Sequence, residues 1–142
     1  MKIEKYEFPE NLLYDKRHFW IRDDGDVLTM GITDFAQQIA GQFIVAEIPD
    51  EGQKVKKNKP FMSIESGKWV GRVYSPVNGV ISEVNEDVDD DATLMNSSPY
   101  GDGWLVKIKP DNTDEIQDLF KVSDEEYVNW VKEEIAEHAQ EE

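Results

Sequence analysis

Cysteine is absent from this chain of 142 residues. The polypeptide therefore supplies no disulfide, no thiolate ligand for zinc and no thiol nucleophile. Long apolar runs are also missing, since none approaches the ~20 residues that cross a bilayer. The opening stretch, MKIEKYEFPE, lacks the apolar segment of a secretory signal and the Arg/Ser-rich composition of a transit peptide. We expect a soluble protein of the cytoplasm.

Positive charge is scarce. Fifteen Lys and Arg residues face 31 Asp and Glu residues, which gives a net charge of −16 and a pI near 4.4. Such a field repels phosphate backbones and anionic lipid surfaces, so we expect neither a nucleic-acid partner nor a membrane partner. It favours protein partners with basic surfaces.

Residue patterns that carry chemistry are sparse as well. The two histidines, His18 and His138, are far apart and lack the spacing of metal ligands, so we predict no metal site. No serine lies in a Gly-x-Ser-x-Gly setting, and Gly67-Lys68 lacks the other residues of a phosphate-binding loop. The acidic run 83–91 lacks the glycine and distal glutamate of a calcium loop, and a solvated, flexible loop is predicted there. No catalytic residue is visible, and the chain does not read as an enzyme.

Strand patterns dominate from Phe19 to about Lys109. Asp23–Asp26 has the chemistry of a hairpin turn between two β-like runs. The most apolar run, Phe43–Ile48, predicts a buried strand. Residues Trp104–Lys109 alternate between apolar and basic, which predicts a strand with one face inward.

Helical signals are short and cluster late in the chain. Thr33 and Gly41 are suited to the N-cap and the stop of a helix over Asp34–Ala40. Capping-box spacing predicts a short helix after Asn112 and a longer one after Ser123. Residues from about 137 to 142 are polar and are expected to fray. The fold class predicted is mainly β with added helices, a small flattened β-sandwich or barrel in one domain, 1–142.

One lysine, Lys68, lies at the break between two β-like runs. The simplest hairpin register leaves Ser66–Trp69 as the turn, so that Lys68 projects from its tip. The predicted cross-strand pairs are Glu65 with Val70, Ile64 with Gly71 and Met62 with Val73.

Three interpretations of Lys68 follow from its place at a tip. A plain solvated lysine is the common case for such a position. A Schiff-base lysine would need burial or a cationic neighbour, and a tip offers neither. An exposed tip lysine is well suited to covalent modification, with the modified group then carried to other proteins.

Several motifs, in order along the chain, resemble those of the glycine cleavage system H proteins. The similarity runs from about Phe8 to Tyr127. The matching residues are His18, Trp20, Gly31–Ala36, Gly52, Glu65-Ser66-Gly67-Lys68, Tyr74–Gly79, Glu83-Val84-Asn85 and Asn96–Leu105.

This resemblance implies the biotinyl/lipoyl-type fold, and it implies lipoic acid in amide linkage on Lys68. In that superfamily, glycines commonly lie 16 residues before and 11 residues after the modified lysine, the places of Gly52 and Gly79 here. Glu65 matches the acidic position that the lipoylating enzyme is thought to read. A biotin carrier fits less well, because Gly67-Lys68-Trp69 is unlike the Met-Lys-Met of biotin domains.

The family resemblance also implies a set of partners. The lipoyl arm of H proteins takes an aminomethyl group from glycine decarboxylase, a pyridoxal-phosphate enzyme, and presents it to a tetrahydrofolate-dependent aminomethyltransferase. Dihydrolipoyl dehydrogenase then reoxidises the arm. A lipoate ligase or a lipoyl transferase attaches it in the first place.

Two departures from the family pattern concern the surroundings of the arm. The family usually has His-Glu-Trp, where this chain has His18-Phe19-Trp20, and it places small residues where Trp69 stands. We assign His18, Gly67 and Trp69 to the expected arm cleft or partner face. Two alternatives follow: a lipoate carrier for sulfur oxidation with a heterodisulfide-reductase-like complex, or an unmodified structural or regulatory homologue.

Overall fold

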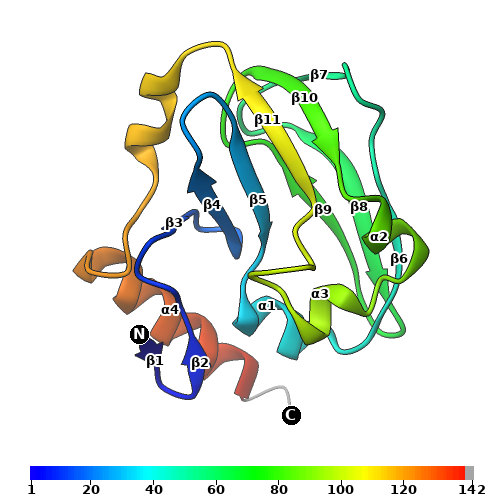
Figure 1. The fold of residues 1–142 in the computed structure, drawn as a ribbon. Coiled ribbons are helices and arrows are strands. Elements are labelled where there is room, and N and C mark those ends of the chain that lie inside the picture. Colours follow the sequence, from blue (N-terminus) through cyan, green and yellow to red (C-terminus); the bar gives the residue numbers. More distant parts are fainter. Residues whose placement is uncertain (140–142) are drawn as a thin grey trace.

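The structure is a computed structural model, and it describes residues 1–139 (Figure 1). The strands are β1 (Lys2–Ile3), β2 (Tyr6–Glu7), β3 (Leu13–Tyr14), β4 (Phe19–Asp23), β5 (Leu28–Ile32), β6 (Phe43–Glu47), β7 (Lys54–Val55), β8 (Pro60–Ser66), β9 (Val70–Tyr74), β10 (Gly79–Val84) and β11 (Val106–Pro110). The helices are α1 (Asp34–Ala40), α2 (Glu86–Asp90), α3 (Leu94–Ser97), α4 (Glu125–Ala139) and the 3₁₀ helix η1 (Thr113–Asp118). None of the helices in the described part is long and apolar enough to cross a membrane.

Two antiparallel sheets form the body of the molecule. The larger has the strand order β3-β4-β5-β11-β10-β7, and the smaller has the order β6-β8-β9. Their inner faces share one apolar core, with Met30 and Ile108 from the larger sheet and Ile64 and Val73 from the smaller. The expected class, mainly β with added helices in a flattened sandwich, is confirmed.

The outer face of the larger sheet is covered on its β3–β4 side. Tyr14 and Trp20 point away from the shared core into a second apolar cluster, which includes Phe8 from the N-terminal segment and Tyr127 and Val131 from α4. Figure 1 shows α4 and the β1–β2 hairpin on this side of the molecule. Strand β4 is therefore buried on both faces, which explains its three consecutive buried residues at the start.

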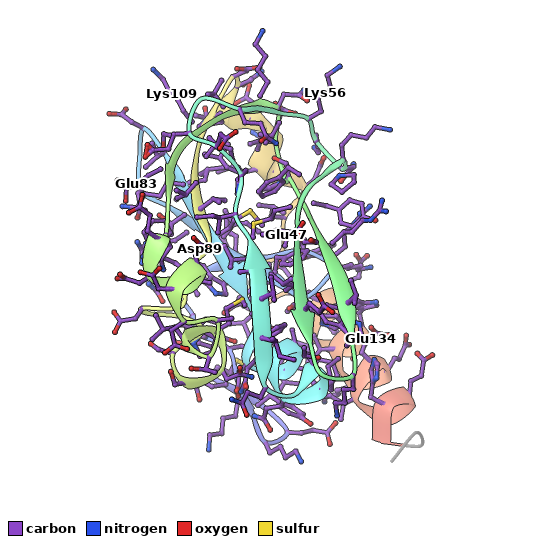
Figure 2. All side chains as sticks on the ribbon, turned by 90° about the vertical axis from the view of Figure 1, so that its right-hand side faces the viewer. Glu47, Lys56, Glu83, Asp89, Lys109 and Glu134 are labelled. Carbon is purple, nitrogen blue, oxygen red and sulfur yellow. The ribbon has the colours of Figure 1, made fainter. Side chains whose placement is uncertain are left out.

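Strand β6 contradicts the prediction of a fully buried strand over Phe43–Ile48. Phe43 and Ala46 are buried, but Ile44 and Val45 are exposed. The strand lies at the edge of the smaller sheet, and a β-bulge between Phe43 and Val45 shifts its register. Figure 2 looks onto the outer face of this sheet, over which no helix of the described chain lies. An apolar run alone cannot reveal that one face lacks a cover.

Helix α1 agrees with the prediction, since the Thr33 hydroxyl accepts the backbone N–H of Ala36 and Gly41 follows the last turn. Helix α4 begins at Glu125, two residues later than the capping-box spacing at Ser123 suggests. It continues through Ala139, so residues 137–139 belong to the helix rather than to a frayed tail. Residues 140–142 of the predicted tail lie outside the described residues.

Two further local predictions need correction. The short helix after Asn112 is the 3₁₀ helix η1; Asn112 caps it through the N–H of Asp114, while Glu115 instead accepts hydrogen bonds from Asn78. The acidic run is not a plain loop. It contains α2, which the side chain of Asn85 caps and which buries Val88. A single apolar residue facing the core is sufficient to order this acidic turn.

Candidate functional site

The β8–β9 hairpin has the register that the sequence predicts. Glu65 pairs with Val70, Ile64 with Gly71 and Met62 with Val73. The backbone N–H of Ser66 donates to the carbonyl of Trp69 at 2.8 Å, which closes a tight turn around Gly67 and Lys68. A tight turn on a regular ladder holds the tip in a fixed position relative to the sheet.

Lys68 lies at this tip and is exposed. Its side chain leans toward the end of α1: the Cε atom is 3.2 Å from the place that a Cβ on Gly41 would occupy. Among residues 1–139, the Lys68 amine takes part in no ion pair or side-chain hydrogen bond. The amine is therefore accessible for reaction, and its root is held by the turn.

Asn96 connects the elements beside this root, and the sequence patterns did not reveal it. Its amide donates to the carbonyl of Gly41 at 2.8 Å, and its side-chain oxygen accepts the N–H of Phe43 at 2.9 Å. The residue thus joins the end of α1 to the start of β6. Gly41 has a φ of +79°, a backbone conformation that glycine adopts readily. These contacts fix the surface on which the stem of Lys68 rests.

Trp69 packs back over the hairpin toward the inner side. A Cβ on Gly71 would lie 2.0 Å from the Trp69 ring, so the indole needs a residue without a side chain there. The ring also makes an edge contact with Phe43, with 6.4 Å between centroids. Gly71 and Trp69 are therefore a matched pair, which gives the departure at Trp69 a structural cause.

Gly67 has no comparable requirement. Its φ is not in the left-handed region, and the nearest heavy atom to a Cβ built there is Cδ1 of Ile44, at an ordinary 3.9 Å. The backbone would accept another small residue. Glu65, three residues before Lys68, is exposed on the outer face of the sheet, between Val45 of β6 and Val70 of β9.

Gly52 and Gly79 lie together, on β10 and its neighbours. The N–H of Gly52 donates to the carbonyl of Ile81, and Gly79 pairs with Val55 of β7. Gly52 has a φ of +89°, whereas a Cβ on Gly79 would approach the carbonyl oxygen of Lys109 to 2.3 Å. Both glycines serve backbone geometry around β10 and do not touch the hairpin tip.

His18 binds to the C-terminal helix. Its Nε2 lies 2.8 Å from the carboxylate of Glu134, and its ring stacks on Trp130 at 4.7 Å between centroids. Burial lowers the pKa of His18, and the Glu134 contact opposes this shift. These contacts give His18 a role in holding α4, while its assignment to an arm cleft remains a prediction. No group of three potential metal ligands occurs within residues 1–139.

Fold and site together define a carrier-type β-sandwich, of the lipoyl class, that presents one accessible lysine on a hairpin. The family model of the glycine cleavage H-protein matches residues 12–134. The chain is 38% identical over 125 residues to the glycine cleavage system H protein of Bacillus licheniformis, covering 88% of this chain and 97% of that protein. It therefore belongs to the glycine cleavage H-protein family.

Two further comparisons agree. The chain is 43% identical over 121 residues to the probable glycine cleavage system H protein 2 of Sulfurisphaera tokodaii, with 82% of each chain covered. The crystal structure of a glycine cleavage system H protein from Mycobacterium marinum superposes with a TM-score of 0.76 at 29% identity, covering 86% of this chain and 97% of that one.

Membership in this family defines the chain as a non-catalytic carrier component. The family carries lipoate, and it places the partners of this chain among the enzymes of the glycine cleavage system. The comparisons favour neither the sulfur-oxidation carrier nor the unmodified homologue.

Proposed function

We propose that the chain is a lipoyl carrier of glycine cleavage whose lipoate is attached to Lys68. The observation that carries the proposal is the accessible, unpaired amine of Lys68 at a fixed hairpin tip, in a chain of the H-protein family. Lipoate bound there would supply a dithiolane that accepts the aminomethyl group produced by glycine decarboxylase and offers it to the aminomethyltransferase. Dihydrolipoyl dehydrogenase is the third proposed partner.

The residues of the tip have distinct parts in this proposal. The Nζ atom of Lys68 forms the amide, which replaces a charged amine by a neutral group. The turn closed by Ser66 and Trp69 fixes the root of the arm. Glu65 offers a carboxylate on the outer face, where a lipoate ligase or lipoyl transferase can read it. We infer a single carrier domain over 1–142.

The charge of the chain supports protein partners. A net charge of −16 raises the rate of encounter with enzymes that surround their active-site entrance with basic residues. The same charge disfavours binding to nucleic acid or to anionic lipid. We propose that the carrier works in the cytoplasm.

Modification is tested by intact-mass spectrometry of the protein purified from its native host. We expect a lipoyl adduct that peptide mapping assigns to Lys68 and that the Lys68→Arg variant lacks. Lys56→Arg, at an exposed lysine far from the tip, is the matched control and retains the adduct. A native protein without any adduct would contradict the carrier proposal.

The client is tested separately with the fully lipoylated protein. We expect it to support exchange of bicarbonate into the carboxyl group of glycine by purified glycine decarboxylase. A lipoylated protein that fails in this assay would contradict the assignment to glycine cleavage while leaving the carrier role intact.

A further inference from the structure

Exposed apolar side chains are concentrated around the hairpin tip. Ile44 is 64% exposed, Val45 40%, Trp69 45% and Val70 67%. The remaining large apolar residue of this kind among those described is Met1, at the chain terminus. Two of the four, Trp69 and Val70, follow Lys68 directly, and the other two come from the neighbouring strand β6.

Three of these side chains form one continuous surface with Glu65. Val45 pairs with Glu65, and Glu65 pairs with Val70, so the three lie in one row across β6, β8 and β9. Ile44 joins them at the bulge, with its Cδ1 near Gly67 of the turn. We call Ile44, Val45, Glu65 and Val70 the hairpin patch.

The next row away from the tip is polar, with Glu47 opposite Ser63 and Ser63 opposite Arg72. Glu47 is labelled in Figure 2, on the face of the sheet toward the viewer. The apolar surface is thus confined to the end of the sheet that carries Lys68, and a polar rim borders it. An apolar centre with a polar rim is the usual anatomy of a protein contact surface.

Such exposure is costly at this place. β6 is an edge strand, and exposed β-branched residues on an edge favour unwanted strand pairing. Other edges of this type carry lysine or proline instead. The side chains of Ile44, Val45 and Val70 contribute little burial to the fold, so their stabilising contact must come from another molecule.

We propose that the hairpin patch is the docking surface for the enzyme that attaches the acyl group to Lys68, with apolar side chains against the three aliphatic residues and a basic group against Glu65. The inference rests on the proposed function. Attachment takes place at Nζ itself, so that enzyme must approach the turn and the residues beside it. Enzymes that use the loaded arm act at its far end and can stay further away.

The patch fits a transient enzyme–substrate contact better than a second copy of this chain. Stable dimers bury large apolar interfaces, whereas this one has three aliphatic side chains around a carboxylate. Two copies would also place Glu65 against Glu65, each in a chain of net charge −16. A basic enzyme surface meets both features of the patch.

The step that this contact serves is balanced with ATP as co-reactant. The lipoate carboxyl group is first activated as an acyl adenylate, with release of pyrophosphate. The amide bond then forms between the acyl carbon and Nζ, the acyl–phosphate bond breaks, and AMP leaves as the amine loses a proton. The patch contributes orientation of the amine and no group that reacts.

The test uses the full-length unmodified chain with purified lipoate–protein ligase, lipoate and ATP. The triple variant Ile44→Thr, Val45→Thr and Val70→Thr keeps β-branched residues but removes apolar surface. We expect kcat/KM for attachment to fall roughly tenfold, mainly through KM. Val80→Thr, the same change at a half-buried position of β10, is the matched control and should leave kcat/KM unchanged. Thermal unfolding confirms that the variants are folded.

A second readout separates attachment from use. Variant protein loaded to completion with excess ligase is assayed for glycine–bicarbonate exchange, and we expect attachment to fall at least fivefold more than exchange. A fall in attachment of less than threefold, or a smaller difference between the two assays, would overturn the inference. So would a dimer in sedimentation that the triple variant abolishes. If the wild-type chain is not acylated on Lys68 at all, the proposed function fails instead.

Discussion

Strands β5 and β6 have similar compositions and opposite surroundings. β5 reads Leu-Thr-Met-Gly-Ile and is buried at all five positions, whereas β6 reads Phe-Ile-Val-Ala-Glu and is exposed at three. β5 lies between β4 and β11 in the sheet that α4 and the N-terminal segment cover, and β6 lies at the edge of the bare sheet. Apolar composition therefore serves folding in one strand and, in our proposal, recognition in the other.

The contrast extends to tryptophan. Trp20 on the covered sheet is fully buried, and its Nε1–H donates to the carbonyl of Pro99 at 2.8 Å. Trp69 beside the bare sheet remains nearly half exposed. Stability is thus concentrated on the covered side, and the side that carries Lys68 can change with a small effect on the fold.

The largest test of this contrast compares two identical substitutions. Trp20→Ala should lower the free energy of unfolding by about 3–5 kcal/mol, because it leaves a cavity and removes a buried hydrogen bond. Trp69→Ala should lower it by about 1 kcal/mol or less, as for other partly exposed residues. Urea unfolding followed by circular dichroism measures both. Similar losses in the two variants would show that the bare side also supports the fold.

A test of intermediate size uses pH on the covered side. Burial raises the pKa of Asp15 to about 6, although its carboxylate accepts the N–H groups of Arg17 and Phe19. The folded state therefore binds this proton more tightly than the unfolded chain, so the stabilisation is complete below about pH 4 and is lost as the pH rises to about 6. Asp15→Asn should raise the free energy of unfolding at pH 7 by about 1–3 kcal/mol.

Asp24 provides the control of opposite sign for the pH test. The hydrogen bond from Arg22 lowers the pKa of Asp24, so its contribution is present at neutral pH and is lost in acid. Asp24→Asn should therefore destabilise the protein at pH 7. Equal responses of the two variants across pH 4–7 would contradict both assignments.

The smallest test compares two glycines of the hairpin. Gly71→Ala should cost about 1 kcal/mol, because the new methyl group displaces the Trp69 ring, and it should be nearly neutral when Trp69 is already alanine. Gly67→Ala should stabilise by about 0.4–1 kcal/mol, since the site has space and the unfolded chain loses freedom. Thermal unfolding of the four proteins measures these values. A destabilised Gly67→Ala variant would show that the turn needs glycine.

The sequence was sufficient for the parts of the site that depend on local pattern. Regular alternation on both sides of a short turn defined the register of 62–73, and the cap at Thr33 defined the start of α1. These features depend on neighbours along the chain, which a single sequence displays. Lys68 at the tip followed directly from that register.

What the sequence could not reveal depends on tertiary cover. The exposure of Ile44 and Val45 follows from the absence of a helix over one sheet in the described chain, and the run itself resembles a buried strand. The link through Asn96 joins segments more than fifty residues apart. The 3₁₀ form of η1 follows from Glu115 bonding to Asn78 instead of capping its own helix.

The position of β11 has a consequence for the order of folding. It is the last strand of the chain, yet it lies between β5 and β10 in the middle of the larger sheet. During synthesis, all of the smaller sheet leaves the ribosome before Val106 and Ile108 are available to complete the core opposite it. Lys68 is therefore made early but gains its rigid support late, and a chain that stops before β11 would present the lysine on an unsupported hairpin.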